Sequence, residues 1–292
     1  MAALANGKHV VTANKDLMAL HGPELLAKAR ANGCDILYEA SVAGGIPIIR
    51  TLIEGFSSDR ITKIMGIVNG TTNYILTKMS QEGAAYADVL REAQALGYAE
   101  ADPTSDVEGL DAARKMTILA TLGFRTEIEL SDVDVTGISG VTQEDIQYAK
   151  QLGYAIKLLG IAESKDDGIS VSVQPTLVKL SHPIASVGGV YNAVYVYGEA
   201  VGETMFYGPG AGELPTATSI VADLVAVIKN AKLGINGRLA SIPYKAKKLK
   251  RDDQITSKFF MLLHVEDQTG VLMQIAQVFA ACEVSIESVM QP

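Results

Sequence analysis

The chain has 292 residues, of which 48% are hydrophobic and 20% charged, and its formal net charge is −8. This length predicts roughly two domains, and the composition is that of a folded protein with a sizeable core. The negative charge argues against a nucleic-acid-binding surface, which needs a basic face. Cys34 and Cys282 form no CxxC pair, so neither a disulfide framework nor a zinc site is indicated. No apolar run approaches the ~18 residues of a membrane span. We therefore expect a cytoplasmic protein with small-molecule partners.

The first part of the chain predicts a βαβ unit. Residues 9–12 have the pattern of a short buried strand, residues 23–31 that of a helix, and CDILYEA, from Cys34, that of a second strand. Strand, helix and strand at this spacing predict a parallel pair that belongs to a doubly wound sheet. Because two strands cannot form such a sheet alone, the chain is expected to begin inside the domain.

The middle of the chain continues this alternation. ITKIMGIVNG (61–70) is typical of a strand, TTNYILTKMSQEG (71–83) of a helix, and YADVLREAQALGY (86–98) of an amphipathic helix. Ser105 and Glu108 match a capping box. They predict a helix from about Asp106 to Leu122 with Gly123 as its stop.

The later part predicts a sheet and a separate tail. Residues 169–178 and 192–201 alternate apolar and polar side chains, as strands with one covered face do. Residues 233–257 are polar and lack periodicity, which indicates a linker, with a loop packed on a dimer of the chain as the alternative. Residues 258–292 predict strand, turn, helix and strand.

Residues 97–115, GYAEADPTSDVEGLDAARK, crowd acidic side chains ahead of Lys115. The five acids are Glu100, Asp102, Asp106, Glu108 and Asp111. Asp111 and Lys115 share one face of the expected helix, and such a pair taken alone is most often a solvated surface pair. However, the helix is apolar nearly all round beyond Lys115, which predicts burial. A lysine buried among carboxylates is a candidate for proton transfer.

Two other stretches leave functional and structural interpretations open. GPGAG, Gly208 to Gly212, precedes an expected helix and could present its amides to a phosphate or nicotinamide, or it could be a simple turn. NGTTN, Asn69 to Asn73, could be only a helix cap. No histidine is assigned to catalysis.

Five motifs in this order resemble the homoserine dehydrogenases of the aspartate pathway: VTANK, YEASVAGGIPII, GIVNGTTNYIL, LGYAEADPTSDVEGLDAARK and GVYNAVYVYGEAVGETMFYGPGAGELPTATSIVADL. The tail from Phe259 resembles the first half of an ACT domain. The chain departs from the family in two places. It has no G-x-G-x-x-G turn for the cofactor pyrophosphate, and the ACT-like tail ends halfway. The resemblance thus implies a chain shortened at both ends.

The resemblance implies an α/β fold with four parts. Residues 1–46 are the remainder of a Rossmann-like nucleotide-binding domain, rejoined by about 208–232. Residues 47–207 are an α+β catalytic and dimerisation domain with a mixed sheet. A linker (233–257) and a partial ACT regulatory segment of ferredoxin-like fold (258–292) follow.

The implied reaction is the NAD(P)-dependent interconversion of L-homoserine and L-aspartate 4-semialdehyde, in threonine, methionine and isoleucine biosynthesis. Matched to the family's motif, Lys115 is the expected proton donor to the aldehyde oxygen, with Asp111 beside it. The expected substrate-binding residues are Glu100, Tyr98, Asp106 and Lys15. The expected cofactor-binding residues are Thr12, Lys15, Gly210, Gly212 and Glu213.

The resemblance also implies a sodium ion, a regulator and an oligomer. The expected sodium ligands are Glu39, Val42, Gly44 and Ile46, the last three through backbone oxygens. A carboxylate beside a glycine-rich turn suits a hard cation, although a plain strand-to-helix connection is the alternative. Asp267, Gly270 and Val271 match the turn that faces an amino-acid effector in ACT domains, usually threonine. The assembly is expected to be a homodimer or homotetramer.

A second hypothesis is a non-catalytic chain that serves as an amino-acid-binding or assembly module, because the glycine-rich cofactor turn is absent. For the same reason, this chain alone is expected to bind NAD(P) weakly. A different semialdehyde-handling oxidoreductase is disfavoured, because no cysteine occupies a plausible nucleophile position.

Overall fold

The computed structural model describes residues 1–237 and 244–290, and it divides into two compact units, Met1–Thr256 and Ser257–Pro292. In the larger unit, β1 (Val10–Val11) pairs in parallel with β2 (Ile36–Leu37) across α2 (Lys15–Ala31). This confirms the predicted parallel βαβ pair. A short helix, α1 (Ala2–Ala5), precedes it.

Helix α2 begins eight residues before the predicted start at Pro23, which lies inside the helix. Its N-cap is Asn14, whose side-chain oxygen accepts a hydrogen bond from the Leu17 amide at 2.9 Å. An asparagine in this position satisfies one of the free amides of the first turn. Lys15 is therefore held in the first turn of α2.

A six-stranded mixed sheet forms the centre of the larger unit, in the order β4-β6-β5-β3-β7-β8. The strands are β3 (Ile61–Ile67), β4 (Val133–Val135), β5 (Tyr154–Lys165), β6 (Gly168–Lys179), β7 (Tyr191–Gly198) and β8 (Gly202–Pro209). Only the β4–β6 pair is parallel, and the other four pairs are antiparallel. The mixed sheet agrees with the expected catalytic domain, while the separate strand β8 was not anticipated from the sequence.

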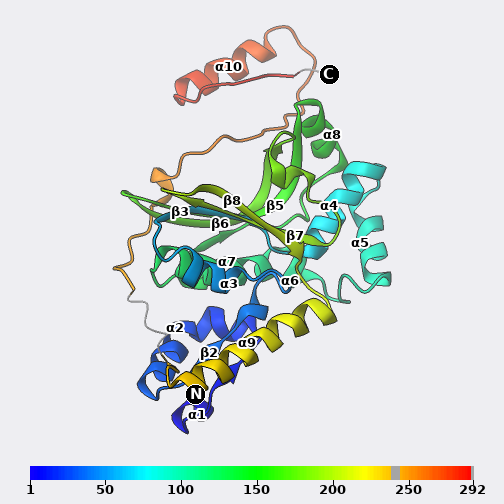
Figure 1. The fold of residues 1–292 in the computed structure, drawn as a ribbon. Coiled ribbons are helices and arrows are strands. Elements are labelled where there is room, and N and C mark those ends of the chain that lie inside the picture. The colour runs from blue at the N-terminus through cyan, green and yellow to red at the C-terminus, as the bar shows by residue number, and fades with distance from the viewer. Residues whose placement is uncertain (238–243, 291–292) are drawn as a thin grey trace. The chain divides into compact units, whose positions relative to one another are not determined.

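Helix α7 (Leu110–Phe124) packs along one side of this sheet, against β3, β5 and β6 (Figure 1). A Cβ atom on Gly123 would lie 2.6 Å from the Ile64 side chain. Gly123 therefore allows α7 to approach β3 closely, and the prediction that it ends the helix is wrong. The other helices of this region are α3 (Ile48–Arg50), α4 (Gly70–Glu82), α5 (Tyr86–Ala95), α6 (Thr104–Val107) and α8 (Gln143–Gln151).

The predicted capping box is also wrong, because the helix expected from Asp106 is divided in two. Helix α6 ends at Val107, and Gly109, at φ 82°, separates it from α7. A Cβ atom on Gly109 would lie 3.1 Å from two valines of the sheet. Both this close contact and the positive φ favour glycine at this position. Ser105 lies within α6 and accepts a hydrogen bond from Arg114 instead of capping a helix.

Helix α9 (Glu213–Leu233) returns to the N-terminal segment, and Figure 1 shows it beside α2 and β2. Asn230 donates to the Asp35 carboxylate at 2.9 Å, and Ser219, Asp223 and Val227 form the buried face of the helix. Among the described residues, α9 alone is long and apolar enough to cross a membrane. One such helix is weak evidence for a span, since helices of globular proteins pass the same test.

Residues 244–250, inside the predicted linker, form contacts with the larger unit. Lys245 pairs with Thr126 and Leu249 with Ile169 in isolated β-bridges. Lys247 also forms an ion pair with Asp132 at 2.9 Å. This part of the segment is therefore a loop packed on its own chain. The predicted linker residues 238–243 lie outside the described residues.

The smaller unit contains helix α10 (Val271–Ala281), which begins after Gly270 at φ 94°. The two strands predicted on either side of it are not formed among residues 257–290. A strand needs a hydrogen-bonded neighbour, and none is present among the described residues of this unit. The 3₁₀ and π turns are η1 (Glu39–Ser41), η2 (Thr51–Gly55), η3 (Leu130–Asp132), η4 (Pro183–Ser186) and η5 (Asp252–Gln254).

Candidate active site

Lys115 lies in the second turn of α7, and its side chain is only 13% exposed. Its Nζ donates a hydrogen bond to the Asp111 carboxylate at 2.7 Å and another to the Val68 carbonyl oxygen at 2.7 Å. An ammonium group has three N–H donors. Two are used here, so one donor of Lys115 is left for a substrate oxygen.

Asp111 is buried and accepts hydrogen bonds from three side chains. Besides Lys115, it contacts Lys15 Nζ at 3.0 Å and Asn69 Nδ2 at 2.9 Å. Burial by itself raises the pKa of the Asp111 carboxyl, but Lys115, Lys15 and Asn69 outweigh burial and lower it to about 2. Asp111 is therefore ionised at neutral pH.

Asn69 connects two of the acids in residues 97–115, Asp106 and Asp111. Its Nδ2 donates to Asp106 at 2.8 Å as well as to Asp111, while its Oδ1 caps α4 through the Thr72 amide. Burial raises the pKa of the Asp106 carboxyl. The sequence suggested only a cap for Asn69. Its hydrogen bonds to the two acids are tertiary contacts, which no local sequence pattern predicts.

Lys15 stands at the start of α2 and joins that helix to α7. Burial lowers the pKa of its ammonium group, but the Asp111 charge outweighs burial and raises it. A second ion pair, between Asp16 and Arg114 at 2.6 Å, joins the same two helices. Lys15, Asp111, Lys115 and Asn69 are called the lysine cluster below.

Glu100 and Tyr98 lie in the loop between α5 and α6. Glu100 is exposed, and within the described residues its carboxylate forms no hydrogen bond or ion pair. The Tyr98 ring packs edge-on against Tyr74, with 5.0 Å between centroids. The carbonyl oxygen of Tyr98 accepts a hydrogen bond from Thr71 at the start of α4. This bond attaches the segment to the helix that Asn69 caps.

The predicted cofactor loop 208–212 and the predicted sodium turn 39–46 contact each other. The Gly45 amide donates to the Pro209 carbonyl at 3.0 Å, and a Cβ atom on Gly44 would lie 2.5 Å from the Gly210 carbonyl oxygen. Gly212, at φ 112°, precedes Glu213, which begins α9 without a side-chain cap. The first amides of α9 are thus open to a ligand.

Thr12 lies apart from the lysine cluster, at the end of β1. Its amide donates to the Leu37 carbonyl at 3.0 Å, and its hydroxyl accepts from the Asn14 amide at 3.1 Å. These bonds place Thr12 two residues before Asn14, the N-cap of the helix that begins at Lys15.

Glu39 is buried, and both of its carboxylate oxygens are already hydrogen-bonded. They accept from the amides of Ile49 at 2.7 Å and Arg50 at 2.9 Å, at the start of α3. Burial raises the pKa of the Glu39 carboxyl. The Gly44 carbonyl accepts from the Ser219 hydroxyl, whereas that of Val42 receives no hydrogen bond within the described residues. No group of three metal-binding side chains occurs in residues 1–237 and 244–290.

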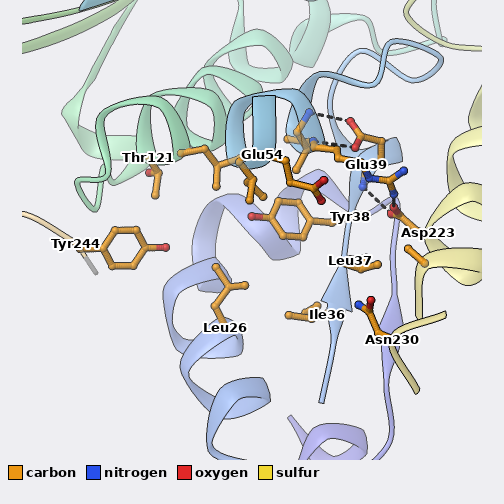
Figure 2. A pocket seen from close by; sticks show the side chains of 15 residues that line it. Leu26, Ile36, Leu37, Tyr38, Glu39, Glu54, Thr121, Asp223, Asn230 and Tyr244 are labelled. Carbon is orange, nitrogen blue, oxygen red and sulfur yellow. Dashed lines mark hydrogen bonds and ion pairs between the residues drawn. The ribbon is translucent and has the colours of Figure 1, made fainter. Parts of the chain in front are cut away.

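A cavity of about 120 Å³ lies between α2, β2 and α7 (Figure 2). Apolar side chains such as Leu26 line most of it, together with Tyr38 and Tyr244, and Glu39 and Asp223 lie at one end. Burial raises the pKa of the Tyr38 hydroxyl. Neither Lys115 nor Asp111 lines this cavity, so it is separate from the lysine cluster.

Fold, site and comparisons together define the class of the protein. Residues 1–39, which contain the βαβ pair, match the model of an NAD-binding domain, and the buried Lys115 on α7 is linked through Asp111 to Lys15 at the start of α2. The protein is an NAD(P)-dependent oxidoreductase. Residues 47–225 match the homoserine dehydrogenase model, and the model for residues 1–39 is described as the NAD-binding domain of the same enzymes. The chain belongs to the homoserine dehydrogenase family.

Individual relatives agree with this family. The chain is 62% identical to homoserine dehydrogenase of Bacillus subtilis, with 99% of this chain and 67% of that protein covered. It is 46% identical to that of Pseudomonas aeruginosa, with 100% and 68% covered. The structure resembles homoserine dehydrogenase from Thiobacillus denitrificans, with TM-score 0.87, 45% identity, and 99% and 68% coverage. A hyperthermophilic archaeal homoserine dehydrogenase in complex with NADPH matches with TM-score 0.69, 32% identity, and 78% and 66% coverage. These relatives favour the enzyme over the non-catalytic alternative.

Proposed function

We propose that the lysine cluster is the catalytic centre for the interconversion of L-homoserine and L-aspartate 4-semialdehyde. The observation that carries the proposal is the Lys115 ammonium, held by Asp111 and the Val68 carbonyl with one donor free. Reduced nicotinamide, when bound, supplies a hydride to the aldehyde carbon. Lys115 gives its proton to the aldehyde oxygen, which becomes the hydroxyl of homoserine.

Asp111 acts on this step through Lys115. Because Asp111 stays ionised, it accepts a charge-assisted hydrogen bond from Lys115 Nζ and so orients that group. In the direction of homoserine oxidation, the neutral amine takes the hydroxyl proton back. Lys15, which contacts the other oxygen of Asp111 at 3.0 Å, adds a second positive charge beside the place where negative charge develops on oxygen.

Glu100 binds the ammonium group of the substrate in this proposal. Asp111 and Asp106 already accept hydrogen bonds from the protein, whereas the Glu100 carboxylate is exposed and without a partner in the described residues. A free carboxylate is the acid best able to accept an ammonium group without losing an internal bond. Tyr98 lies in the same loop as Glu100, and Asp106 lies in α6, which follows it.

The cofactor lies along the loop 208–212 and the start of α2. The open amides at the start of α9 suit negative charge or a carboxamide oxygen, and Glu213 is exposed there. Thr12 follows the carboxyl end of β1 and Lys15 begins α2, and ligands of open α/β sheets bind outside the carboxyl ends of the strands. The choice between NAD and NADP is left open.

Sodium is the proposed cation of the turn 39–46. The residues that would hold it are Glu39, Val42, Gly44 and Ile46. The support is the unbonded Val42 carbonyl beside the buried Glu39 carboxylate. Thermal unfolding in sodium chloride and in choline chloride of equal ionic strength tests this, and equal melting temperatures would count against the ion.

Assembly and regulation complete the proposal. The side of the sheet opposite α7 carries Met65, Tyr195 and Met205, together with the stacked pair Tyr191 and Tyr207, and it suits a homodimer. Light scattering measures the oligomer, and a monomer at micromolar concentration contradicts the dimer.

Threonine is the proposed effector of the turn at Asp267, Gly270 and Val271, and calorimetric titration without heat would exclude it.

The proposed setting is the cytoplasm, in the biosynthesis of threonine, methionine and isoleucine. The family assignment supports this setting. Cell fractionation with an activity assay tests the compartment, and growth of a gene-deletion strain with and without these amino acids tests the pathway.

Steady-state kinetics of Lys115 variants test the catalytic role. Lys115→Ala should lower kcat by roughly 10²-fold or more, the scale for loss of a positioned general acid. Lys115→Arg should not restore it, because arginine does not release its proton at working pH. The matched control is Lys78→Ala, which removes a lysine that also pairs with an acid four residues away, Glu82 at 2.8 Å.

Each outcome has a distinct meaning. Normal turnover in both Lys115 variants removes this lysine from the mechanism. A folded wild-type chain without detectable turnover, even at cofactor concentrations high enough to offset weak binding, would instead favour the amino-acid-binding or assembly module.

A further inference from the structure

Asn192 is the strongest unexplained polar group outside the lysine cluster. It is 1% exposed, and its Oδ1 is buried without a hydrogen-bond partner. Within the described residues its side chain forms no hydrogen bond at all. A buried amide without a partner is costly, and in native proteins such a group usually serves a ligand or an ordered water.

The position of Asn192 points to a ligand of the active site. It is the second residue of β7, and its neighbour Ala193 pairs with Ile67 of β3. Val68, which follows Ile67, accepts the hydrogen bond from Lys115. Asn192 therefore lies at the end of the sheet where the catalytic lysine is held.

The other neighbour of Asn192 is the glycine-rich loop. Asn192 pairs with Gly208 across the β7–β8 hairpin, and its carboxamide lies where a Cβ atom of Gly210 would be. The loop continues through Gly212 to the open first turn of α9. Asn192 thus joins the lysine cluster to the proposed cofactor loop.

The hydrogen-bonding groups of the Asn192 amide indicate which ligand it binds. A primary amide presents one acceptor and one donor side by side, and the exchange of its oxygen and nitrogen leaves the same pair. A phosphate only accepts at neutral pH, and an ammonium group only donates. The nicotinamide ring carries a primary carboxamide, which offers the matching donor and acceptor.

We propose that Asn192 binds the carboxamide of the nicotinamide ring and so fixes the rotation of the ring beside Lys115. This inference rests on the proposed function. It assigns Asn192 to cofactor binding, with no part in proton transfer.

The test compares NADP⁺ with its 3-acetylpyridine analogue, in which a methyl ketone replaces the amide and no N–H remains. Dissociation constants come from competition against NADPH fluorescence. The wild-type chain should prefer NADP⁺ by about 5- to 10-fold, the ratio expected for one hydrogen bond. Asn192→Leu keeps the shape of the side chain and should abolish this preference.

A second readout needs no cofactor. Because Asn192 has no partner, Asn192→Leu should leave the melting temperature of the free protein unchanged or raise it. The matched control is Asn73→Leu, since the Asn73 side chain donates to the carbonyls of Val187, Gly189 and Tyr191. This control should lower the melting temperature by several degrees.

The outcomes separate the two proposals. An Asn192→Leu variant that loses stability like Asn73→Leu and keeps the preference for NADP⁺ overturns the inference. So does a wild-type chain that binds both dinucleotides equally. A wild-type chain that binds neither dinucleotide contradicts the proposed function, and the inference about Asn192 falls with it.

Discussion

Asp111 joins three helices through one carboxylate. Its hydrogen bonds reach Lys15 on α2, Asn69 at the cap of α4, and Lys115 on its own helix. A buried carboxylate is stable as an ion only when such donors surround it. The same contacts therefore stabilise the fold and hold the Lys115 side chain in place.

Because Asp111 must be ionised to form these contacts, the free energy of unfolding is expected to depend on pH. The pKa of the Asp111 carboxyl is about 2 in the folded protein, against 3.8 as the ordinary value. A lowered pKa contributes stability that is fully present above about pH 4 and is lost as the pH falls toward 2. The contribution is on the order of 2 kcal/mol.

Denaturant unfolding of the wild type and Asp111→Asn between pH 2 and pH 6 measures this contribution. The difference between their free energies of unfolding should shrink as the pH falls. A difference that stays constant over this range would show that the charge of Asp111 is not responsible.

Glu100 is the residue on which substrate affinity is expected to depend. Glu100→Gln should raise the KM for homoserine by roughly 10-fold while changing kcat less, because the lost ion pair is made with bound substrate in every state. The control is Asp102→Asn. Asp102 accepts hydrogen bonds from Thr104, which an asparagine can also accept, so this variant removes a charge and keeps the local turn. Equal KM changes in the two variants would exclude a specific role for Glu100.

At the scale of elements, two glycine-rich segments far apart in sequence support each other. The turn at Gly44 and the loop at Gly210 approach so closely that a Cβ atom on Gly44 would lie 2.5 Å from a backbone oxygen. Gly44 also has φ 33°, a conformation that other residues rarely adopt. The contact holds the proposed sodium turn against the proposed cofactor loop.

Gly44→Ala should therefore disrupt both segments. We expect a loss of about 2–4 kcal/mol in the free energy of unfolding, from the backbone overlap and the strained φ together. Gly33→Ala is the control, because Gly33 has φ 61° with no atom within 4 Å of an added Cβ. It should cost only ~1 kcal/mol. Equal losses, measured by urea unfolding, would mean that the contact with Gly210 is unimportant.

At the scale of the whole molecule, the segment after α9 is part of the larger unit. Lys245 and Leu249 form β-bridges to the unit, and Lys250 forms an ion pair with Asp167 at 2.9 Å. The unit boundary lies only after Thr256. Residues 244–256 thus belong with the catalytic part of the chain.

Two shortened chains test this boundary. A chain of residues 1–256 should melt within a few degrees of the full chain, because the larger unit is then intact. A chain of residues 1–237 should melt clearly lower, since it loses the bridges at Thr126 and Ile169. Identical melting temperatures for the two shortened chains would show that the packed loop adds no stability.

The sequence predicted much of the fold, and its errors share a cause. The parallel βαβ pair and the buried helix that carries Lys115 were correct, because hydrophobic period acts over a few positions, whereas the mixed sheet was expected from the family resemblance. The capping box at Ser105 and the stop at Gly123 were wrong, because close packing against the sheet decides the conformation there. The predicted strands around α10 failed for lack of hydrogen-bonded neighbours.

Five sequence motifs were enough to predict the family. The contact between Asp111 and Lys115 could also be predicted, since residues four apart on a helix share a face. The other side chains that contact Asp111 could not be predicted, because they come from distant parts of the chain. Lys15 and Asn69 reach Asp111 from other helices, and Asn192 reaches Gly210 from strand β7. Local spacing carries no information about such contacts, because they depend on how whole elements pack. Packing brings Lys15, Lys115 and Asp111 together, and it places the Asn192 amide at the end of the sheet where Val68 accepts a hydrogen bond from Lys115.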